Sequence, residues 1–192
     1  IEAALQSMEY AQSQGADVKS LRFRIEHLES PMMEQISRMQ KLNICAGLSS
    51  AFIYGLGDSH LEALGYDRLA DAFPAKTLME NGIPVACNCD FPICNVNPML
   101  GIYSMVVRKT EKGQSFGGKK EAISRMDALK AYTINAAYLL WKEQELGSLK
   151  AGKAADMVVF EDDFLRVADD ALKDVRVYMT IANGETVYQL EQ

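Results

Sequence analysis

The hydrophobic positions of this chain switch repeatedly between the spacing of a helix and the spacing of a strand. Residues 1–14 carry apolar side chains at helical intervals, and Gly15 ends that pattern. Residues 21–27 then alternate, so Ile25 and His27 are predicted to share one strand face with the other odd-numbered residues. The chain therefore opens with a predicted helix and a predicted strand that ends in a histidine.

The alternation of elements continues to about residue 145. The pair Ser30-Pro31 predicts an N-cap followed by proline at the first helical position. The predicted elements that follow are a helix to Leu42, a strand over 43–46, an amphipathic helix over 68–81 and a buried strand over 83–90. Strands that alternate with helices are typical of βα units, so we expect an α/β fold with a parallel sheet.

Two long connections separate these elements from one another and from the last large helix. We expect loops over 47–66 and 91–123, the second with a helical piece from Leu100 to Val107. Ser124 and Asp127 have the spacing of a capping box, which predicts that the last helix starts at Ser124. In an α/β barrel, loops of this kind shape the substrate pocket.

The pattern changes after residue 146. Residues 157–160 predict a strand, and two further predicted strands, 175–182 and 186–190, flank Asn183-Gly184. Asn-Gly between alternating hydrophobic residues is the strongest short-range signal of a hairpin. These strands are too few to form a stable sheet alone, so we expect them to need partner strands from elsewhere.

Composition and charge narrow the functional classes. The 192 residues are 48% hydrophobic and 24% charged, which is ordinary for a globular protein. The formal net charge of −6, with scattered basic residues, argues against nucleic acid or an anionic membrane as a partner. The apolar stretches are too short to span a bilayer, and the four cysteines include no Cys-x-x-Cys pair. A cytoplasmic location is therefore expected.

Two residues stand where the chemistry of a barrel enzyme is usually found. His27 and Asp90 each end a predicted strand, two βα units apart, and in a parallel barrel both would project at the carboxyl face. Imidazole nitrogen and carboxylate oxygen bind catalytic divalent metals, and a carboxylate beside a reacting water can also move its proton. From the pattern alone, a hydrogen-bonded core histidine and an aspartate that caps the next loop remain open as alternatives.

Other residues with reactive side chains have structural interpretations. His60, expected at an exposed helix start, is a weaker candidate for contact with a substrate. Cys87 and Cys89 share a predicted strand face, but buried cysteines that only pack are far commoner than metal ligands. Residues 117–120, Gly-Gly-Lys-Lys, lack the rest of a phosphate-binding loop, so a solvated loop is expected there.

Six short motifs occur in order along nearly the whole chain. They are Arg24 to His27, Asn81 to Val85, Asp90 to Pro92, Asn97 to Ile102, Ala131 to Ala137 and Gly147 to Asp156. Together they resemble the amidohydrolase superfamily, within it amidohydrolase family 3, the branch of YtcJ-like proteins and N-substituted formamide deformylases. Because several motifs agree at once, the resemblance is specific.

The resemblance implies a fold and a chemistry. Members are (β/α)₈ barrels, of the TIM-barrel kind, with a small β-domain, and they use one or two divalent metals to activate water against amide-type bonds of small molecules. The resemblance implies that His27 ends the sixth strand as a metal ligand, and that Asp90 ends the eighth as a metal ligand and the catalytic proton shuttle. Zinc is the expected metal. Residues 1–145 would then be part of the barrel, about strands six to eight, and residues 146–192 part of the small β-domain, a β-sandwich.

The sequence departs from the family's pattern in two ways. The family has Gly-Ser before the aspartate, where this chain has Asn88-Cys89, so we expect a tuned site. The other ligands of the relatives, a His-x-His pair, a bridging lysine or acid and a histidine on the fifth strand, are not among the 192 residues. Two ligands do not complete a catalytic zinc site, so we expect a C-terminal fragment of a C–N hydrolase that is inactive alone.

An incomplete barrel also has consequences for partners. Its outer strands would have unpaired edges, so we expect the chain to associate with itself or with the missing N-terminal part of the barrel. The rival hypothesis is a non-catalytic regulatory or interaction module that keeps the amidohydrolase scaffold, and the Asn88-Cys89 replacement favours it. A barrel enzyme without a metal is the third alternative.

Overall fold

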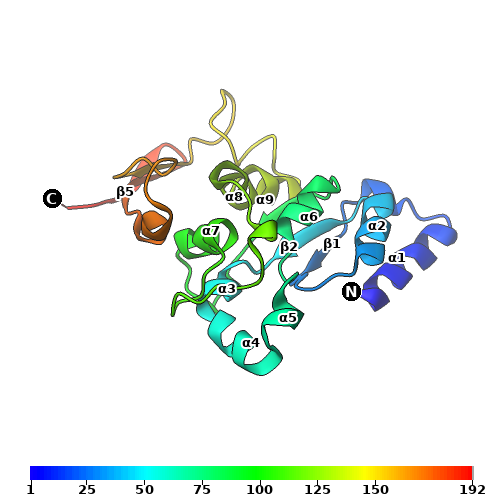
Figure 1. The fold of residues 1–192 in the computed structure, drawn as a ribbon. Coiled ribbons are helices and arrows are strands. Elements are labelled where there is room, and N and C mark those ends of the chain that lie inside the picture. Colours follow the sequence, from blue (N-terminus) through cyan, green and yellow to red (C-terminus); the bar gives the residue numbers. More distant parts are fainter. Residues whose placement is uncertain (192) are drawn as a thin grey trace.

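Three short parallel strands lie at the centre of the computed structural model, which describes residues 1–191 (Figure 1). They are β1 (Arg24–Glu26), β2 (Cys45–Leu48) and β3 (Val85–Cys87), in the sheet order β1-β2-β3. Arg24 pairs with Cys45 and Ala46 pairs with Val85, both in parallel register. The predicted parallel sheet is therefore confirmed, with β2 in the middle.

The strand predicted over residues 21–27 is shorter in the structure. Leu21 and Phe23 precede β1 and are 51% and 40% exposed, and Arg22 between them has a φ of 47° that turns the chain. Leu21 and Phe23 therefore do not share a strand face with Ile25, and this prediction is wrong. Within the described residues β1 pairs with β2 alone, and β2 begins at Cys45, opposite Arg24, so the residues before Arg24 lie beyond the start of β2. A strand extends only as far as a partner supplies backbone groups to pair with.

Two helices near the N-terminus pack against each other beside β1 (Figure 1). They are α1 (Glu2–Ser13) and α2 (Met33–Leu42), with the short 3₁₀ helix η1 (Val18–Ser20) after α1. Ile36 and Met39 of α2 are 1% and 0% exposed, because the apolar face of this helix lies on the core.

The predicted N-cap at Ser30 is wrong. α2 begins at Met33, three residues later, and its cap position is Met32. The Gln35 side chain accepts a hydrogen bond of 3.0 Å from the backbone N–H of Met32. A side chain inside the first turn thus satisfies a backbone donor that the helix leaves unpaired.

Most of the connection predicted as a loop over 47–66 is helical. It contains α3 (Ala51–Gly55) and α4 (Gly57–Leu64), and α5 (Tyr66–Leu69) follows directly. Phe52 and Ile53 of α3 are 8% and 0% exposed. The loop prediction is wrong because the glycines separate short helices, and such helices take their stability from tertiary burial rather than from their own sequence.

The amphipathic helix predicted over 68–81 is divided in two. α5 ends at Leu69, and α6 (Ala75–Glu80) begins after Pro74. Proline lacks a backbone N–H and cannot continue a helix interior. Phe73, just before it, has a φ of 51° and is 1% exposed, so the break turns an aromatic ring into the core.

Three helices and one 3₁₀ turn follow the parallel sheet. They are α7 (Pro98–Val107), η2 (Lys119–Glu121), α8 (Arg125–Tyr132) and α9 (Ile134–Leu139). The predicted helix start at Ser124 is confirmed, because its hydroxyl accepts a 3.0 Å hydrogen bond from the backbone N–H of Asp127. Among residues 1–191, every helix falls short of the length and apolar character needed to cross a membrane.

A second, antiparallel sheet lies in the C-terminal part of the chain. Its strands are β4 (Met157–Phe160), β5 (Val177–Ala182) and β6 (Glu185–Gln189), with the 3₁₀ helix η3 (Asp169–Asp174) between β4 and β5. Asn183 and Gly184 join β5 to β6 with φ values of 52° and 84°. The predicted hairpin is confirmed, since both central residues of such a turn need positive φ.

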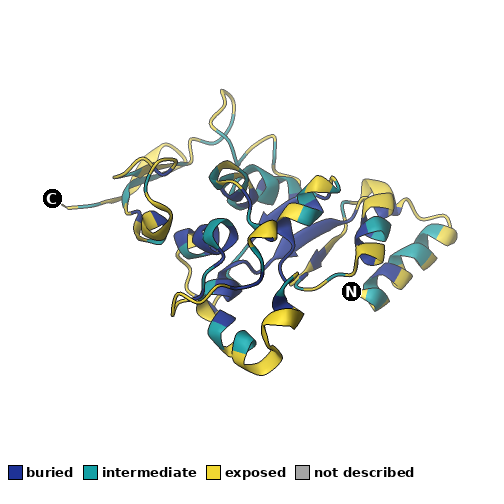
Figure 2. Cartoon of the chain, viewed as in Figure 1, coloured by how far each residue is buried: buried dark blue, intermediate teal, exposed yellow. Residues whose placement is uncertain are grey.

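The segment between strands β4 and β5 belongs to the main hydrophobic core. Buried residues gather around the parallel sheet and α7 (Figure 2), and Phe164 and Leu172 belong to the same hydrophobic cluster. Arg125 of α8 donates hydrogen bonds of 2.9 Å and 2.6 Å to the carbonyls of Phe164 and Val167. The antiparallel sheet is thus tied to the helices, while the domain boundary near residue 145 stays a prediction.

A buried polar contact holds α8 against the residues after β2. The Ser50 hydroxyl lies 2.8 Å from the Tyr132 hydroxyl, and burial raises the pKa of the Tyr132 phenol. Gly101 of α7 passes beside them. A β-carbon at Gly101 would overlap the Tyr132 hydroxyl and would lie 2.9 Å from the Ser50 oxygen, so only glycine fits here.

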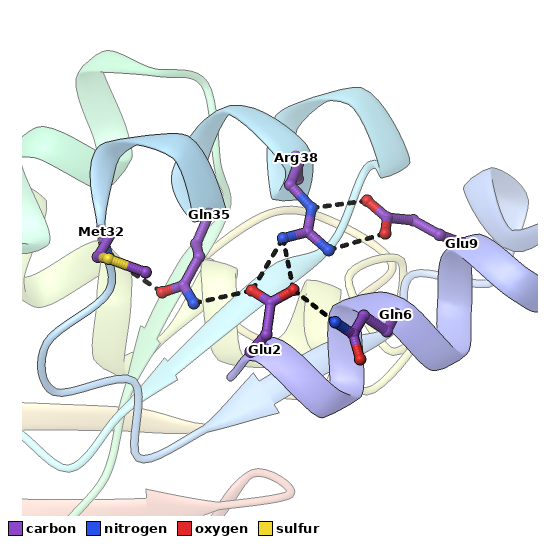
Figure 3. Close-up of polar contacts among 6 residues, drawn as sticks. All are labelled: Glu2, Gln6, Glu9, Met32, Gln35 and Arg38. Carbon is purple, nitrogen blue, oxygen red and sulfur yellow. Dashed lines mark hydrogen bonds and ion pairs between the residues drawn. The ribbon is translucent and has the colours of Figure 1, made fainter.

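An ion-pair network joins α1 to α2 (Figure 3). Arg38 donates to both carboxylate oxygens of Glu9 at 2.7 Å, and to those of Glu2 at 2.9 Å and 2.8 Å. Gln35 donates a further hydrogen bond of 3.1 Å to Glu2. Arg38 lowers the pKa of Glu9, and Gln35 and Arg38 together lower the pKa of Glu2. The network lies beside Leu5, which is fully buried.

Replacing Gly101→Ala should lower the free energy of unfolding by about 1–3 kcal/mol, because the new methyl group overpacks the contact with Tyr132. Urea denaturation of the chain measures this loss. The double variant with Tyr132→Phe should recover part of it, since the overlapping oxygen is gone. Gly118→Ala is the matched control, because a β-carbon there meets only ordinary contacts at 3.5 Å or more. Equal stability of the two alanine variants would contradict this packing.

Replacing Arg38→Met should weaken the docking of α1 at neutral pH, which hydrogen exchange of the α1 amides measures. Because the folded pKa values of both carboxyls are lowered, their contribution is fully present above the usual value of 4.5 and is lost as the pH falls through the lowered values. The variant and the parent should therefore converge in acid. Arg68→Met, on an exposed residue of α5, should leave α1 unchanged at every pH. A difference that persists in acid would argue against the carboxylates.

Candidate active site

The residues that end the three parallel strands lie at one edge of the sheet. His27 follows β1, Ser49 follows β2, and Asn88 to Asp90 follow β3. Parallel strands all end at the same edge, and α/β proteins bind ligands there. The structure therefore places both predicted metal ligands, His27 and Asp90, at the carboxyl edge of the same sheet.

The opposite edge of the sheet is covered by α9. Asn135 donates a 2.9 Å hydrogen bond to the carbonyl of Val85, the first residue of β3. Arg24, the first residue of β1, donates one of 3.2 Å to the carbonyl of Leu139. Because the amino ends of the strands are closed in this way, the carboxyl edge is where a ligand would approach.

A chain of hydrogen bonds connects the ends of all three strands. The Ser49 hydroxyl lies 2.8 Å from Nδ1 of His27 and donates a 3.1 Å hydrogen bond to Oδ1 of Asn88. Ser49 is 0% exposed, so water does not compete for its hydroxyl. His27 is thereby linked through β2 to the segment that carries Asp90.

Both predicted ligands have left-handed backbone conformations. The φ values are 55° for His27 and 51° for Asp90, in a region that costs a non-glycine residue about 1–3 kcal/mol. His27 turns the chain directly after β1, whereas Asp90 turns it three residues after β3 ends at Cys87. Among residues 1–191, six other non-glycine residues share a positive φ, so this conformation supports the site without defining it.

His27 and Asp90 keep donor atoms available for a ligand. The His27 ring is exposed and stacks on Phe52 with the ring centroids 6.0 Å apart. None of the hydrogen bonds between residues 1–191 uses Nε2 of His27 or the carboxylate of Asp90, which is half-buried. Within the same residues, no three His, Cys, Asp or Glu side chains are grouped to hold a metal ion. The described part of the chain therefore offers two donors at this edge.

The cysteines near this edge are packing residues. Cys87 and Cys94 are 7% and 8% exposed, belong to the hydrophobic core and form no disulfide. Burial raises the pKa of the Cys87 thiol to about 12, and burial also raises the pKa of Cys94. Both side chains therefore pack among apolar residues of the core. The structural interpretation of these cysteines agrees with the geometry.

The remaining candidates have structural contacts. His60 lies within α4, half-buried, with its ring 6.5 Å from that of Phe116. In the segment 117–120, the carbonyl of Gly117 accepts a hydrogen bond from the Tyr66 hydroxyl, and Lys120 forms an ion pair with Asp71. These contacts explain the residues without a bound phosphate.

Sequence reasoning missed Ser49 as a member of this site. The sequence contained a signal for it. His27 and Asp90 became candidates because each was predicted to end an outer strand, and Ser49 comes directly after the middle strand, β2. This signal was hidden because the strand was predicted over 43–46, so Ser49 fell within the loop predicted to follow it. The role of Asn88 follows from the same register, because its backbone N–H bonds to the carbonyl of Leu48.

The sequence matches the model of a known family over residues 1–188, and that family is described as the amidohydrolase family. It is 32% identical to "Putative amidohydrolase YtcJ" of Bacillus subtilis, over 86% of this chain and 32% of that protein. It is 28% identical to the "N-substituted formamide deformylase" of Arthrobacter pascens, over 86% of this chain and 31% of that protein. The chain thus spans about a third of the length of these curated relatives.

Solved structures show a similar fold. An uncharacterized metal-dependent hydrolase from Pyrococcus furiosus superposes with a TM-score of 0.63 and 26% identity, over 80% of this chain and 29% of that chain. One from Pyrococcus horikoshii gives a TM-score of 0.69 at 24% identity, over 85% of this chain and 32% of that chain. The arrangement of strands and helices described above therefore occurs in solved hydrolases of this kind.

Iodoacetamide should modify Cys87 only after the chain unfolds, because the reactive thiolate is suppressed by a pKa of about 12 and the thiol is buried. Mass spectrometry of the peptide that contains Cys87, after labelling at pH 8 with and without denaturant, measures both rates. The denatured chain serves as the control for intrinsic reactivity. Rapid labelling of Cys87 in the native chain would show that the residue is not held in the core.

Proposed function

The chain belongs to the amidohydrolase family, and we propose that it forms the C-terminal part of a metal-dependent hydrolase that cleaves carbon–nitrogen bonds of small amide-type molecules. The observation that carries this proposal is the pair of uncommitted donors, Nε2 of His27 and the carboxylate of Asp90, at one edge of a parallel sheet. The names of the curated relatives, an amidohydrolase and a formamide deformylase, support the reaction class.

A divalent metal, zinc in this proposal, fits the donors at that edge. Imidazole nitrogen and carboxylate oxygen are two of the three ligand types that zinc uses in proteins. His27 and Asp90 are the residues that would hold the ion. When bound, zinc polarises the scissile carbonyl and makes water a stronger nucleophile at neutral pH. Catalytic zinc has three protein ligands or more, so further ligands would come from outside the described residues.

Asp90 has a second proposed role, in proton transfer. Its carboxylate oxygens accept no hydrogen bond from residues 1–191, so they are available to take a proton from the attacking water. The same oxygen would then deliver that proton to the leaving nitrogen, which makes the amine a stable product. His27 has no such role, because Ser49 holds its ring through Nδ1 and its other nitrogen would hold the proposed ion.

Apolar residues beside Asp90 suit a substrate with an apolar substituent. Phe91 and Ile93 follow Asp90 and are 70% and 57% exposed. A cavity of about 210 Å³ lies next to this segment, lined in part by Ile93, Tyr54 and Glu111. We therefore propose an N-substituted amide or formamide as substrate, with its substituent against Phe91 and Ile93.

The proposed enzyme needs more strands than the three described. Residues 1–145 would supply strands six to eight of a (β/α)₈ barrel, and residues 146–192 part of a small β-domain. The pairing of β1 supports this, because among the described residues β1 pairs with β2 alone and its other side could pair with a further strand. The partner would be the N-terminal part of the barrel, or a second copy of the chain where that part is lacking. The four free thiols are compatible with the cytoplasm.

The test uses the chain joined to, or mixed with, the N-terminal part of the barrel, loaded with zinc and assayed on N-substituted formamides. Asp90→Asn should lower kcat by about 10²–10⁴-fold, because it removes the proton carrier. His27→Ala should lower the zinc content measured by elemental analysis. His60→Ala is the matched control and should change neither. Full zinc content and activity in the His27 and Asp90 variants would overturn the proposal, and the 192-residue chain alone should show no turnover.

A further inference from the structure

The Ser49 hydroxyl holds a position between two side chains of different strands. It lies 2.8 Å from Nδ1 of His27 and 3.1 Å from Oδ1 of Asn88. The backbone just before Ser49 is held from both neighbouring strands. The backbone N–H of Leu28, after β1, donates to the carbonyl of Gly47, and that of Asn88, after β3, donates to the carbonyl of Leu48. A fully buried hydroxyl on a fixed backbone has little freedom to choose other partners.

Counting the protons in the series of contacts from Asn88 through Ser49 to His27 assigns the direction of each hydrogen bond. A serine hydroxyl has one proton, and here Ser49 donates it to Oδ1 of Asn88, which can only accept. The contact between Ser49 and His27 must then run the other way, with Nδ1–H of His27 donating to the Ser49 oxygen. A neutral imidazole has a single N–H, so Nε2 of His27 is left with a free lone pair.

We propose that Ser49, held by Asn88, is a positioning residue that selects the Nδ1–H tautomer of His27 and so presents Nε2 to a metal ion. The metal half of this statement rests on the proposed function, whereas the tautomer is a property of the chain without metal. Ligating histidines are commonly held through their other ring nitrogen by a carboxylate, a backbone carbonyl or water. In this chain a buried serine and an asparagine would supply that support.

The stacking of the His27 ring supports the same orientation. The ring lies against Phe52 with an interplanar angle of 30° and a centroid separation of 6.0 Å, so its plane is set by packing as well as by the hydrogen bond. Phe52 is 8% exposed and belongs to α3, which begins two residues after Ser49. One short segment, residues 49–52, therefore contacts the ring at its nitrogen and at its face.

The alternative is a rotated Asn88 amide. Nδ2 of Asn88 would then donate to Ser49, Ser49 would donate to Nδ1 of His27, and the proton would sit on Nε2. A histidine in that form cannot bind a metal through Nε2 without first losing the proton. Replacing Asn88→Asp distinguishes the two arrangements, because a carboxylate can only accept and so enforces the direction proposed here.

Long-range ¹H–¹⁵N correlation spectra of the metal-free chain, labelled with ¹⁵N-histidine, report the tautomer directly. The spectra are recorded at about pH 8.5, where free imidazole is neutral. The chain has two histidines, and a His60→Ala variant assigns the signals. The parent chain and Asn88→Asp should show the Nδ1–H form of His27. Ser49→Ala and Asn88→Ala should shift it toward the Nε2–H form that free histidine prefers.

Ser50→Ala is the matched control for these variants. Ser50 is the neighbouring buried serine, and its hydroxyl contacts Tyr132 rather than His27, so its loss should leave the His27 tautomer unchanged. Asn88→Ala keeps the test valid if Ser49→Ala fails to fold, since Asn88 is only half-buried. An Nε2–H signal in the parent chain, or an unchanged signal in both the Ser49 and the Asn88 alanine variants, would overturn the proposal.

Zinc titration of the assembled protein separates this proposal from the proposed function. Ser49→Ala should weaken zinc binding about 10–100-fold, the usual effect of removing a residue that supports a metal ligand. If the parent protein binds no zinc while His27 still shows the Nδ1–H form, the proposed function fails and the tautomer assignment stands. If zinc binds equally to the parent and to Ser49→Ala, the positioning role is wrong although the hydrolase proposal survives.

Discussion

The parallel pairing of three short strands is the constraint on which the rest of the structure depends. All four residues of β2 are buried, and β1 and β3 fix it from both sides. Gly47 of β2 leaves room for the Glu26 carboxylate, which a β-carbon there would overlap. A register shift of one residue would exchange the faces of a strand and separate His27 from Ser49. The site therefore exists only in this register.

Two adjacent serines after β2 illustrate how closely the core and the site are joined. Ser49 bonds to His27 and Asn88 at the carboxyl edge, while Ser50 bonds to Tyr132 of α8 inside the protein. Both hydroxyls are fully buried and both are satisfied, as buried polar groups need to be. The packing of α7 and α8 thus holds the same backbone segment that orients the histidine. In the proposed enzyme, ligand geometry would depend on core packing one residue away.

In the proposed enzyme, the described residues would supply only part of the catalytic centre. They bring one imidazole and one carboxylate to the carboxyl edge, close the opposite edge with α9, and pair β1 on one side only. The chain spans about a third of the length of the curated relatives named above. The proposed hydrolase activity would belong to the assembled barrel, whereas the orientation of His27 belongs to this chain itself.

The sequence alone determined the features that depend on neighbouring residues. The order of the strands, the helix start at Ser124 and the hairpin at Asn183-Gly184 are local, because each depends on spacing or turn chemistry within a few residues. The tertiary structure decided the length of β1, the helices of the segment 47–66 and the contacts of Ser49. Each of these depends on burial or pairing with residues far along the chain, and no local pattern encodes such partners.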